Sequence, residues 1–129
     1  MLVSDIMQTD VKSVSAFATI REAMKLMSEH QVKSLVVERK DSADAYGIIT
    51  YGSILRTIVA EEGDIDLIHV YDVCAKPAIT ITSGLDARHA AGLMVRHDFR
   101  RVLVLEGDEL CGIVTVDDIM APVLSMANQ

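Results

Sequence analysis

A threonine and an aspartate three positions apart form the pattern in this chain that is best suited to chemistry. Thr115 ends an apolar, strand-like run and Asp118 follows at the expected start of a helix, so a short turn should bring both side chains to one edge. A carboxylate has two acceptor oxygens and can accept two neighbouring hydroxyls at once, and the first turn of a helix offers free N–H groups to an anion. A purely structural interpretation stays open, because an acidic residue near a helix start favours the helix whether or not anything binds. Asp117 would serve that role equally well.

The same pattern occurs earlier in the chain in an altered form. Residues 112–119 read Gly-Ile-Val-Thr-Val-Asp-Asp-Ile, and residues 47–54 read Gly-Ile-Ile-Thr-Tyr-Gly-Ser-Ile. Thr50 therefore matches Thr115, but Ser53 stands where Asp118 stands. A serine hydroxyl lacks the charge and the second oxygen of a carboxylate. We expect the earlier site to be weaker, altered or empty.

The repetition extends over most of the chain. Residues 3–7 recur at 70–74 and residues 20–27 recur at 87–94, an offset of 67 that falls to 65 at the motifs above. We assign repeat 1 to residues 1–62 and repeat 2 to residues 67–129, joined by an acidic, mostly polar link at 61–66. A repeat of about 60 residues is small for an independent core. We therefore expect the repeats to form one folded unit, with a ligand groove between them.

Hydrophobic periodicity and capping signals give each repeat the order β-α-β-β-α, and the fold class is α+β. Repeat 1 has an extended piece at 11–15, a helix from the cap Thr19 to His30, strands at 35–38 and 46–50, and a helix at 52–60. Repeat 2 has an extended piece at 78–82, a helix capped by Asp86, strands at 102–106 and 110–115, and a helix starting near Asp117. Short turns of helix open the repeats at 4–7 and 70–74. Pro122 should kink or end the last helix, because proline removes a helical hydrogen bond.

Charge and composition exclude several classes of function. The chain has 129 residues, half of them apolar, and a net charge of −7. This charge opposes non-specific binding to nucleic acid or to anionic membranes. No apolar run approaches the ~18 residues of a membrane span, and Asp5 and Asp10 interrupt any signal-peptide pattern. We expect a cytoplasmic protein with reduced thiols.

Residues for catalysis or metal binding do not group in the sequence. Cys74 and Cys111 do not form a metal-ligand spacing. His30 and His97 fall at matching helix ends, where a cation suits the helix dipole. Neither a Ser/His/Asp grouping nor a glycine-rich phosphate loop is recognisable, so we expect no metal site and no enzyme.

The doubled β-α-β-β-α pattern, with its Gly-Ile-Val-Thr-Val-Asp-Asp-Ile string, closely resembles the CBS domain, named after cystathionine β-synthase. Two such domains in tandem form a Bateman module, and the resemblance covers roughly residues 3–60 and 70–124. It implies two repeats packed about a pseudo-two-fold axis, with the helices on one side of each sheet. It also implies a homodimer formed through helices, with no obligatory cofactor. The ligand would be an adenine nucleotide: AMP, ADP, ATP or S-adenosylmethionine.

The resemblance also implies roles for individual residues. Asp118 would accept the ribose 2′- and 3′-hydroxyls, and Thr115 would contact sugar or phosphate. Basic residues before a strand often reach phosphates bound mainly by the partner repeat. Lys33 would then face the Thr115/Asp118 side, and Arg100 and Arg101 the Thr50/Ser53 side, unless these bases are merely solvated surface. The backbone around Lys12-Ser13 and Ile79-Thr80 would frame the adenine.

The resemblance leads to a stand-alone regulatory module that signals in trans to an unknown target protein. One alternative is a dimerisation or interaction module without a physiological ligand, which the Ser53 substitution slightly favours and the intact Thr115/Asp118 pair opposes. A small enzyme is the other alternative, and it lacks any recognisable catalytic group.

Overall fold

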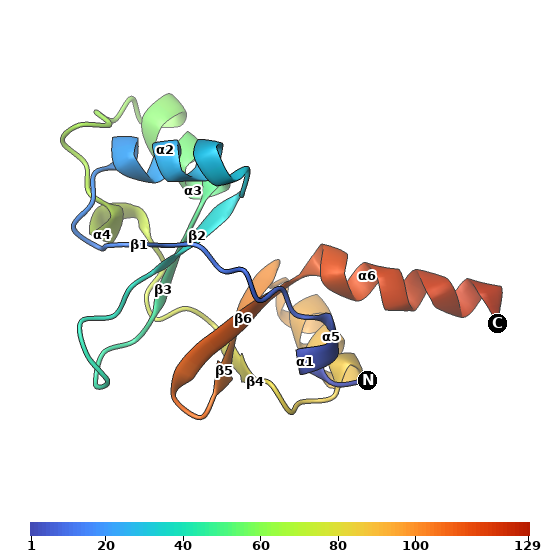
Figure 1. Cartoon of the computed structure of the whole chain (residues 1–129). Coiled ribbons are helices and arrows are strands. Elements are labelled where there is room, and N and C mark those ends of the chain that lie inside the picture. Colours follow the sequence, from blue (N-terminus) through green and yellow to red (C-terminus); the bar gives the residue numbers. More distant parts are fainter. The chain divides into compact units, whose positions relative to one another are not determined.

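Two small sheets, one from each repeat, carry the fold (Figure 1). The computed structural model describes all residues 1–129. The strands of repeat 1 are β1 (Ser13–Val14), β2 (Ser34–Val37) and β3 (Gly47–Thr50), and those of repeat 2 are β4 (Thr80–Thr82), β5 (Arg101–Glu106) and β6 (Glu109–Thr115). In each sheet the first two strands are parallel and the last two antiparallel. The register places Ser34 opposite Thr50 and Arg101 opposite Thr115, so each motif threonine ends its strand beside the start of the neighbouring strand.

The helices begin and end largely where the sequence predicts. They are α1 (Val3–Ile6), α2 (Ile20–His30), α3 (Tyr51–Leu55), α4 (Val70–Val73), α5 (Ala87–His97) and α6 (Val116–Ser125), with a π-helix η1 (Arg56–Ala60) after α3 and a 3₁₀ turn η2 (Met126–Asn128) after α6. Thr19 Oγ1 accepts the Glu22 N–H at 3.2 Å, and Asp86 Oδ1 accepts the Arg88 N–H at 2.8 Å. Each expected cap therefore starts its helix. The structure confirms the predicted α+β class.

Helix α6 corrects one of the two effects expected of Pro122, because it does not end there but continues to Ser125; the kink stays a prediction. The φ angle that the proline ring imposes is compatible with a helix, and the missing N–H costs a single hydrogen bond. Ser125 Oγ donates to the Pro122 carbonyl at 2.7 Å and satisfies an acceptor in the last turn.

The compact units of the structure differ from the sequence repeats by an exchange of their first segments. One unit is residues 12–78, the central unit; the other is residues 1–11 with 79–129, the terminal unit. Helix α1 belongs to the terminal unit, where the Val3 N–H donates to the Leu85 carbonyl at 2.8 Å. Helix α4 belongs to the central unit, where the Val70 N–H donates to the Ala18 carbonyl at 2.8 Å. The helix that opens each repeat therefore completes the sheet unit of the other repeat.

Each unit has its own apolar core, and the two exchanged valines help to form them. Val3 is fully buried with Ala90, Met94 and strand residues of β5 and β6. Val70 is fully buried with residues of β1, α2, β2, β3 and α3. The 61–66 link lies in the central unit, where the Asp66 carboxylate forms two hydrogen bonds with the Arg21 guanidinium. Side-chain burial and backbone hydrogen bonds thus both hold the opening segments in their units.

Candidate functional site

The Thr115/Asp118 pair forms a reciprocal cap at the start of α6. Asp118 Oδ2 accepts the Thr115 N–H at 2.7 Å and the Thr115 hydroxyl at 3.0 Å, while Thr115 Oγ1 lies 3.4 Å from the Asp118 nitrogen, which donates to it. Asp118, not the exposed Asp117, therefore fills the structural role that the sequence left open. The cap holds the carboxylate in a fixed position in which it is only half-buried.

Gln8 is the site residue that sequence reasoning missed. Its side-chain Nε2 donates to both oxygens of Asp118, at 3.0 Å to Oδ1 and 3.2 Å to Oδ2, across 110 positions of the chain. Its backbone is fixed by two hydrogen bonds with Ile113, 2.9 Å and 3.0 Å long. No local pattern marks Gln8, because it follows a short helix and its role depends on the exchange of opening segments. A comparison of the repeats would have shown only that Ala75 occupies the matching position.

The geometry leaves the Asp118 carboxylate able to bind more hydroxyls. Oδ2 carries the two bonds from Thr115 and a longer one from Gln8, whereas Oδ1 accepts from Gln8 alone. A carboxylate oxygen has two lone pairs, and hydrogen bonds to an ionised acceptor are short and strong. The site can therefore hold a diol at Oδ1, either beside the Gln8 amide or in its place.

The other predicted residues of the terminal unit lie in the same sheet or directly before its strands. Arg101 is half-buried and pairs with Thr115 across β5 and β6, and the exposed Arg100 accepts the Val116 N–H at its carbonyl, at 3.1 Å. The Ile79 carbonyl accepts the Leu103 N–H at 2.9 Å directly before β4 begins, and Thr80 in β4 pairs with Leu103 of β5. Six predicted site residues therefore lie in one sheet, directly before one of its strands, or in the helix that follows it.

In the central unit, Thr50 and Ser53 form an uncharged version of the cap. The Ser53 hydroxyl donates to the Thr50 carbonyl at 2.8 Å, and Thr50 Oγ1 accepts the Ser53 N–H at 3.3 Å. Ala75 takes the place of Gln8 and makes the same kind of backbone bridge, with two bonds of 2.9 Å to Ile48. The bridge is kept, but it carries no polar side chain. The Ser53 hydroxyl donates its single proton to the Thr50 carbonyl. Because serine is uncharged, this end offers no carboxylate to a ligand.

Lys33, Lys12 and Ser13 also belong to the central unit. The Lys33 carbonyl accepts the Tyr51 N–H at 2.9 Å, and the Lys33 ammonium lies 5.8 Å from the centre of the Tyr51 ring. The Lys12 carbonyl accepts the Val36 N–H at 2.9 Å, and Ser13 pairs with Val36 in the sheet. The ammonium thus contacts its own unit through a cation–π interaction. The cross-repeat phosphate roles of Lys33, Arg100 and Arg101 stay predictions.

Neither cysteine is part of this site. Both thiols are free and half-buried, and burial raises the pKa of each above its ordinary value. Cys111 packs against the core of the terminal unit, as expected for a small apolar side chain. The structure groups no His, Cys, Asp and Glu side chains as a metal would need. None of its helices combines the length and apolar character of a membrane span.

Comparison with known proteins now identifies the class. The sequence matches the CBS domain family over residues 3–60 and again over 70–125, so the chain belongs to this family as a tandem pair. The hexameric CBS-CP12 protein from bloom-forming cyanobacteria has a similar structure, with a TM-score of 0.91 and 31% identity over 98% of this chain and 73% of that chain. The predicted family and fold are therefore confirmed.

Two curated relatives show the range of proteins in which the pair occurs. Uncharacterized protein MK0525 of Methanopyrus kandleri is 31% identical over 120 residues, which cover 92% of this chain. Arabinose 5-phosphate isomerase KdsD of Salmonella typhimurium is 30% identical over 120 residues, again 92% of this chain. The chain spans 60% of the first relative's length and 36% of the second's.

Proposed function

We propose that this CBS pair is a regulatory module that binds an adenine nucleotide at the Thr115/Asp118 end and signals to a partner protein in trans. The ligand is AMP, ADP, ATP or S-adenosylmethionine. One observation carries the proposal: a half-buried carboxylate is held in position by Thr115 while one of its oxygens accepts only a glutamine amide.

Free-energy magnitudes support a ribose diol as the group bound. A hydrogen bond to a charged acceptor contributes about 1.5–3 kcal/mol, so two hydroxyls on Asp118 would supply much of the energy for micromolar binding, about 8 kcal/mol. Because Thr115 fixes the carboxylate before the ligand arrives, little side-chain entropy is lost on binding. The adenine would lie along the Ile79-Thr80 backbone. The phosphates would extend away from Asp118 toward cationic side chains, since the carboxylate repels them.

Deoxynucleotides test this proposal directly. Calorimetric titration should give one strong site per chain for AMP, with about tenfold weaker binding for 2′-deoxy-AMP and for 3′-deoxy-AMP, since each loses one charge-assisted hydrogen bond. AMP should bind more tightly than adenosine at low salt, and the difference should shrink as salt screens the phosphate. Equal affinities for AMP and both deoxynucleotides would rule out diol recognition by Asp118.

A second candidate, an interaction module without a ligand, is supported by the exposed apolar residues of the C-terminal segment. Val116, Met120 and Val123 are 43–49% exposed, and Leu124 and Met126 are 62–64% exposed. The similar cyanobacterial CBS-CP12 protein is described as hexameric, and we propose that this chain pairs through its helices into a homodimer. Under this candidate no adenine nucleotide would raise the melting temperature, whereas a ligand at 100 times its dissociation constant adds about 2.7 kcal/mol of stability.

We infer that the module regulates and does not catalyse. The site holds a capped aspartate, a threonine and an amide, and none of these has the partner that a nucleophile or a general base needs. The isomerase KdsD matches this chain over 36% of its length, and the remainder of that enzyme lies outside the match. Its sugar-phosphate chemistry is therefore not proposed for this chain.

A further inference from the structure

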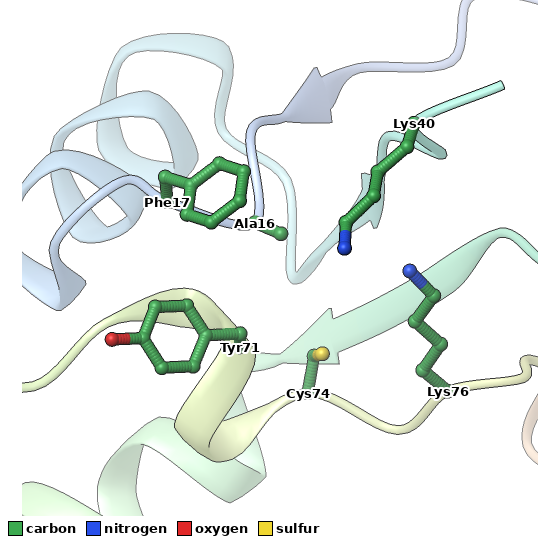
Figure 2. A pocket seen from close by; sticks show the side chains of 6 residues that line it. All are labelled: Ala16, Phe17, Lys40, Tyr71, Cys74 and Lys76. Carbon is green, nitrogen blue, oxygen red and sulfur yellow. The ribbon is translucent and has the colours of Figure 1, made fainter. Parts of the chain in front are cut away.

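A pocket of about 370 Å³ lies in the central unit, at the end of the sheet opposite to Thr50 and Ser53 (Figure 2). β2 begins at Ser34, across from Thr50, and ends at Val37, which pairs with Val14 at the end of β1. The pocket is lined by residues that follow these two strand ends and by the α4 segment: Ala16, Phe17, Lys40, Tyr71, Cys74 and Lys76. Its volume is within the range of small-molecule sites.

Two exposed aromatic rings form one wall of the pocket. Phe17 is 66% exposed, in a chain with only three tyrosines and two phenylalanines. Tyr71 is 52% exposed, and the two ring centroids lie 6.1 Å apart in an edge-to-face arrangement. The Tyr71 ring is held in place by stacking on His69 at 5.1 Å and by a 3.0 Å hydrogen bond from its backbone N–H to the Ala16 carbonyl. Rings fixed in this way leave apolar surface for a further planar group.

Two lysines stand on the other side of the pocket. Figure 2 shows the Lys40 and Lys76 side chains extending toward the same space. The Lys76 ammonium lies 2.7 Å from the Asp44 carboxylate, which also accepts the Lys40 backbone N–H at 2.8 Å. The bond from Lys76, more than that backbone bond, lowers the pKa of Asp44 to about 2, so this acid is ionised at neutral pH. The two lysines are the charged residues that line the pocket, and with Asp44 beside them they carry a net charge of +1, although the chain carries −7.

Cys74 makes the remaining surface of the pocket neutral. Burial raises the pKa of its thiol, although nearby Lys76 opposes the effect. The thiol therefore stays protonated at neutral pH and behaves as a small apolar group. The pocket is suited to non-covalent binding.

The fold does not require these residues, because the other repeat lacks them. Ser83 and Gly84 match Ala16 and Phe17, and Ser4, Met7 and Thr9 match Tyr71, Cys74 and Lys76. In repeat 2, a two-residue turn at Gly107-Asp108 replaces the longer connection that carries Lys40. The central unit has these aromatic and basic side chains, and the terminal unit forms a similar sheet without them. These side chains are a property of the pocket and not of the CBS architecture.

We propose that this pocket is a second ligand site, which binds a small planar aromatic anion such as an aromatic phosphate or carboxylate. The ring packs against Phe17 and Tyr71, and the anionic group lies between the Lys40 and Lys76 ammonium groups. The pocket shares no residue with the Thr115/Asp118 end, because all of its lining residues belong to the central unit.

Phenyl phosphate is the probe for this site, with cyclohexyl phosphate, benzyl alcohol and inorganic phosphate as partial probes. In amide NMR titrations of the full chain, phenyl phosphate should bind at least about threefold more tightly than each partial probe, and should shift the resonances of Phe17, Tyr71 and Cys74. Equal binding by cyclohexyl phosphate, or shifts confined to residues outside the pocket, would overturn the proposal.

Three variants complete the test. Phe17→Ala and Lys40→Ala should each weaken phenyl phosphate binding at least about threefold, and both positions are exposed, so the fold should survive. Lys25→Ala is the matched control, since Lys25 is an exposed lysine on α2 outside the pocket. It should leave the affinity unchanged. If Lys25→Ala weakens binding as much as Lys40→Ala, the probe senses only the general charge of the protein, and the site does not exist.

Discussion

The two strand-to-helix ends of this chain share a backbone but differ in charge. At both ends a threonine caps the helix, the third helical residue bonds back to it, and the preceding strand is bridged by the exchanged opening segment. Asp118 with Gln8 at one end is replaced by Ser53 with Ala75 at the other. The cap and the backbone bridge of the central unit form without a carboxylate and without an amide side chain. The requirements of this backbone arrangement therefore explain the threonine and the turn. They do not explain why a carboxylate and an amide occur together at one end.

Asp118 and Gln8 occur together at one of the chain's two strand-to-helix turns, and their occurrence together favours a binding role there. Serine satisfies the cap with its own hydroxyl, so the cap does not require an acid at position 118, and the favourable interaction of an acid with the helix dipole is also available to Asp117. A half-buried carboxylate needs hydrogen-bond donors, and Thr115 and Gln8 provide them to Asp118. A ligand with two hydroxyls would use this prepared acceptor.

Removing the acid should have the largest effect. Asp118→Ala should weaken AMP binding at least about tenfold, because one or two hydrogen bonds to a charged acceptor are lost. Calorimetry on both proteins measures the change. Ser53→Ala is the matched control, since it removes the side-chain group that corresponds to the Asp118 carboxylate in the central unit and should leave the strong site unaltered. An unchanged affinity for Asp118→Ala would remove this residue from the site and leave its cap as its only role.

Adding an acid at the neutral end should have the next largest effect. Ser53→Asp supplies the missing carboxylate at a helix start, where an acidic residue also interacts favourably with the helix dipole by about 0.3–1 kcal/mol. A second AMP site should then appear, or the existing weak one should strengthen severalfold, in the same calorimetric titration. Gly52→Asp would place the charge where Asp117 stands and should not have this effect. If neither variant gains affinity, features other than the acid distinguish the two ends.

Gln8→Ala should have a smaller effect and the opposite sign to Asp118→Ala. The amide occupies both oxygens of Asp118 in the ligand-free protein, so its removal frees acceptors that the ribose would otherwise have to share. Because Gln8 is exposed and water can replace its amide at the carboxylate, we expect only part of a charge-assisted hydrogen bond to be recovered, a gain in AMP affinity of roughly two- to tenfold. Ala75→Gln is the reciprocal variant, and it should not change the strong site. Weaker binding by Gln8→Ala would mean that the amide contacts the ligand directly.

The smallest effect is expected for Lys76→Ala, which changes the pKa of Asp44 in the connection between β2 and β3. This connection is longer than the corresponding turn in repeat 2. The folded-state pKa of Asp44, about 2, lies below the ordinary value of 3.8 because Lys76 donates to it. The Lys76 bond therefore stabilises the fold at pH values above about 4, and this stability is lost as the pH falls toward 2. Carboxyl NMR titration of Lys76→Ala should show a higher Asp44 pKa. Lys40→Ala should leave it nearly unchanged, because Lys40 bonds through its backbone.

Local sequence signals predicted most of the elements, for identifiable reasons. Caps at Thr19 and Asp86 fixed the starts of α2 and α5, and the apolar runs gave the two antiparallel pairs. The Thr115/Asp118 pair was found because both residues lie in one turn. Pro122 did not end the last helix as its type suggested, because a helix on the protein surface can lose one hydrogen bond and continue.

Contacts between residues far apart in the sequence could not be predicted from local patterns. Gln8 reaches Asp118 only because α1 packs with repeat 2, and the repeat pattern does not say which sheet an opening helix joins. The pocket of Phe17, Lys40 and Tyr71 brings together three separate segments, none of which carries a motif. Sequence spacing predicts contacts within a turn or between paired strands. It does not predict which distant segments fill the remaining surface.

The exchange of opening helices also sets an order for events on the ribosome. Residues 12–78 form one continuous unit, so the central unit can fold during synthesis as soon as α4 has left the exit tunnel. The terminal unit is discontinuous, and residues 1–11 must wait, unpaired, for strands made roughly a hundred residues later. The contact between Gln8 and Asp118 is among the last to form. A chain stalled before α6 would therefore display a complete central unit but no nucleotide site, so that only a chain synthesised through α6 could respond to the proposed ligand.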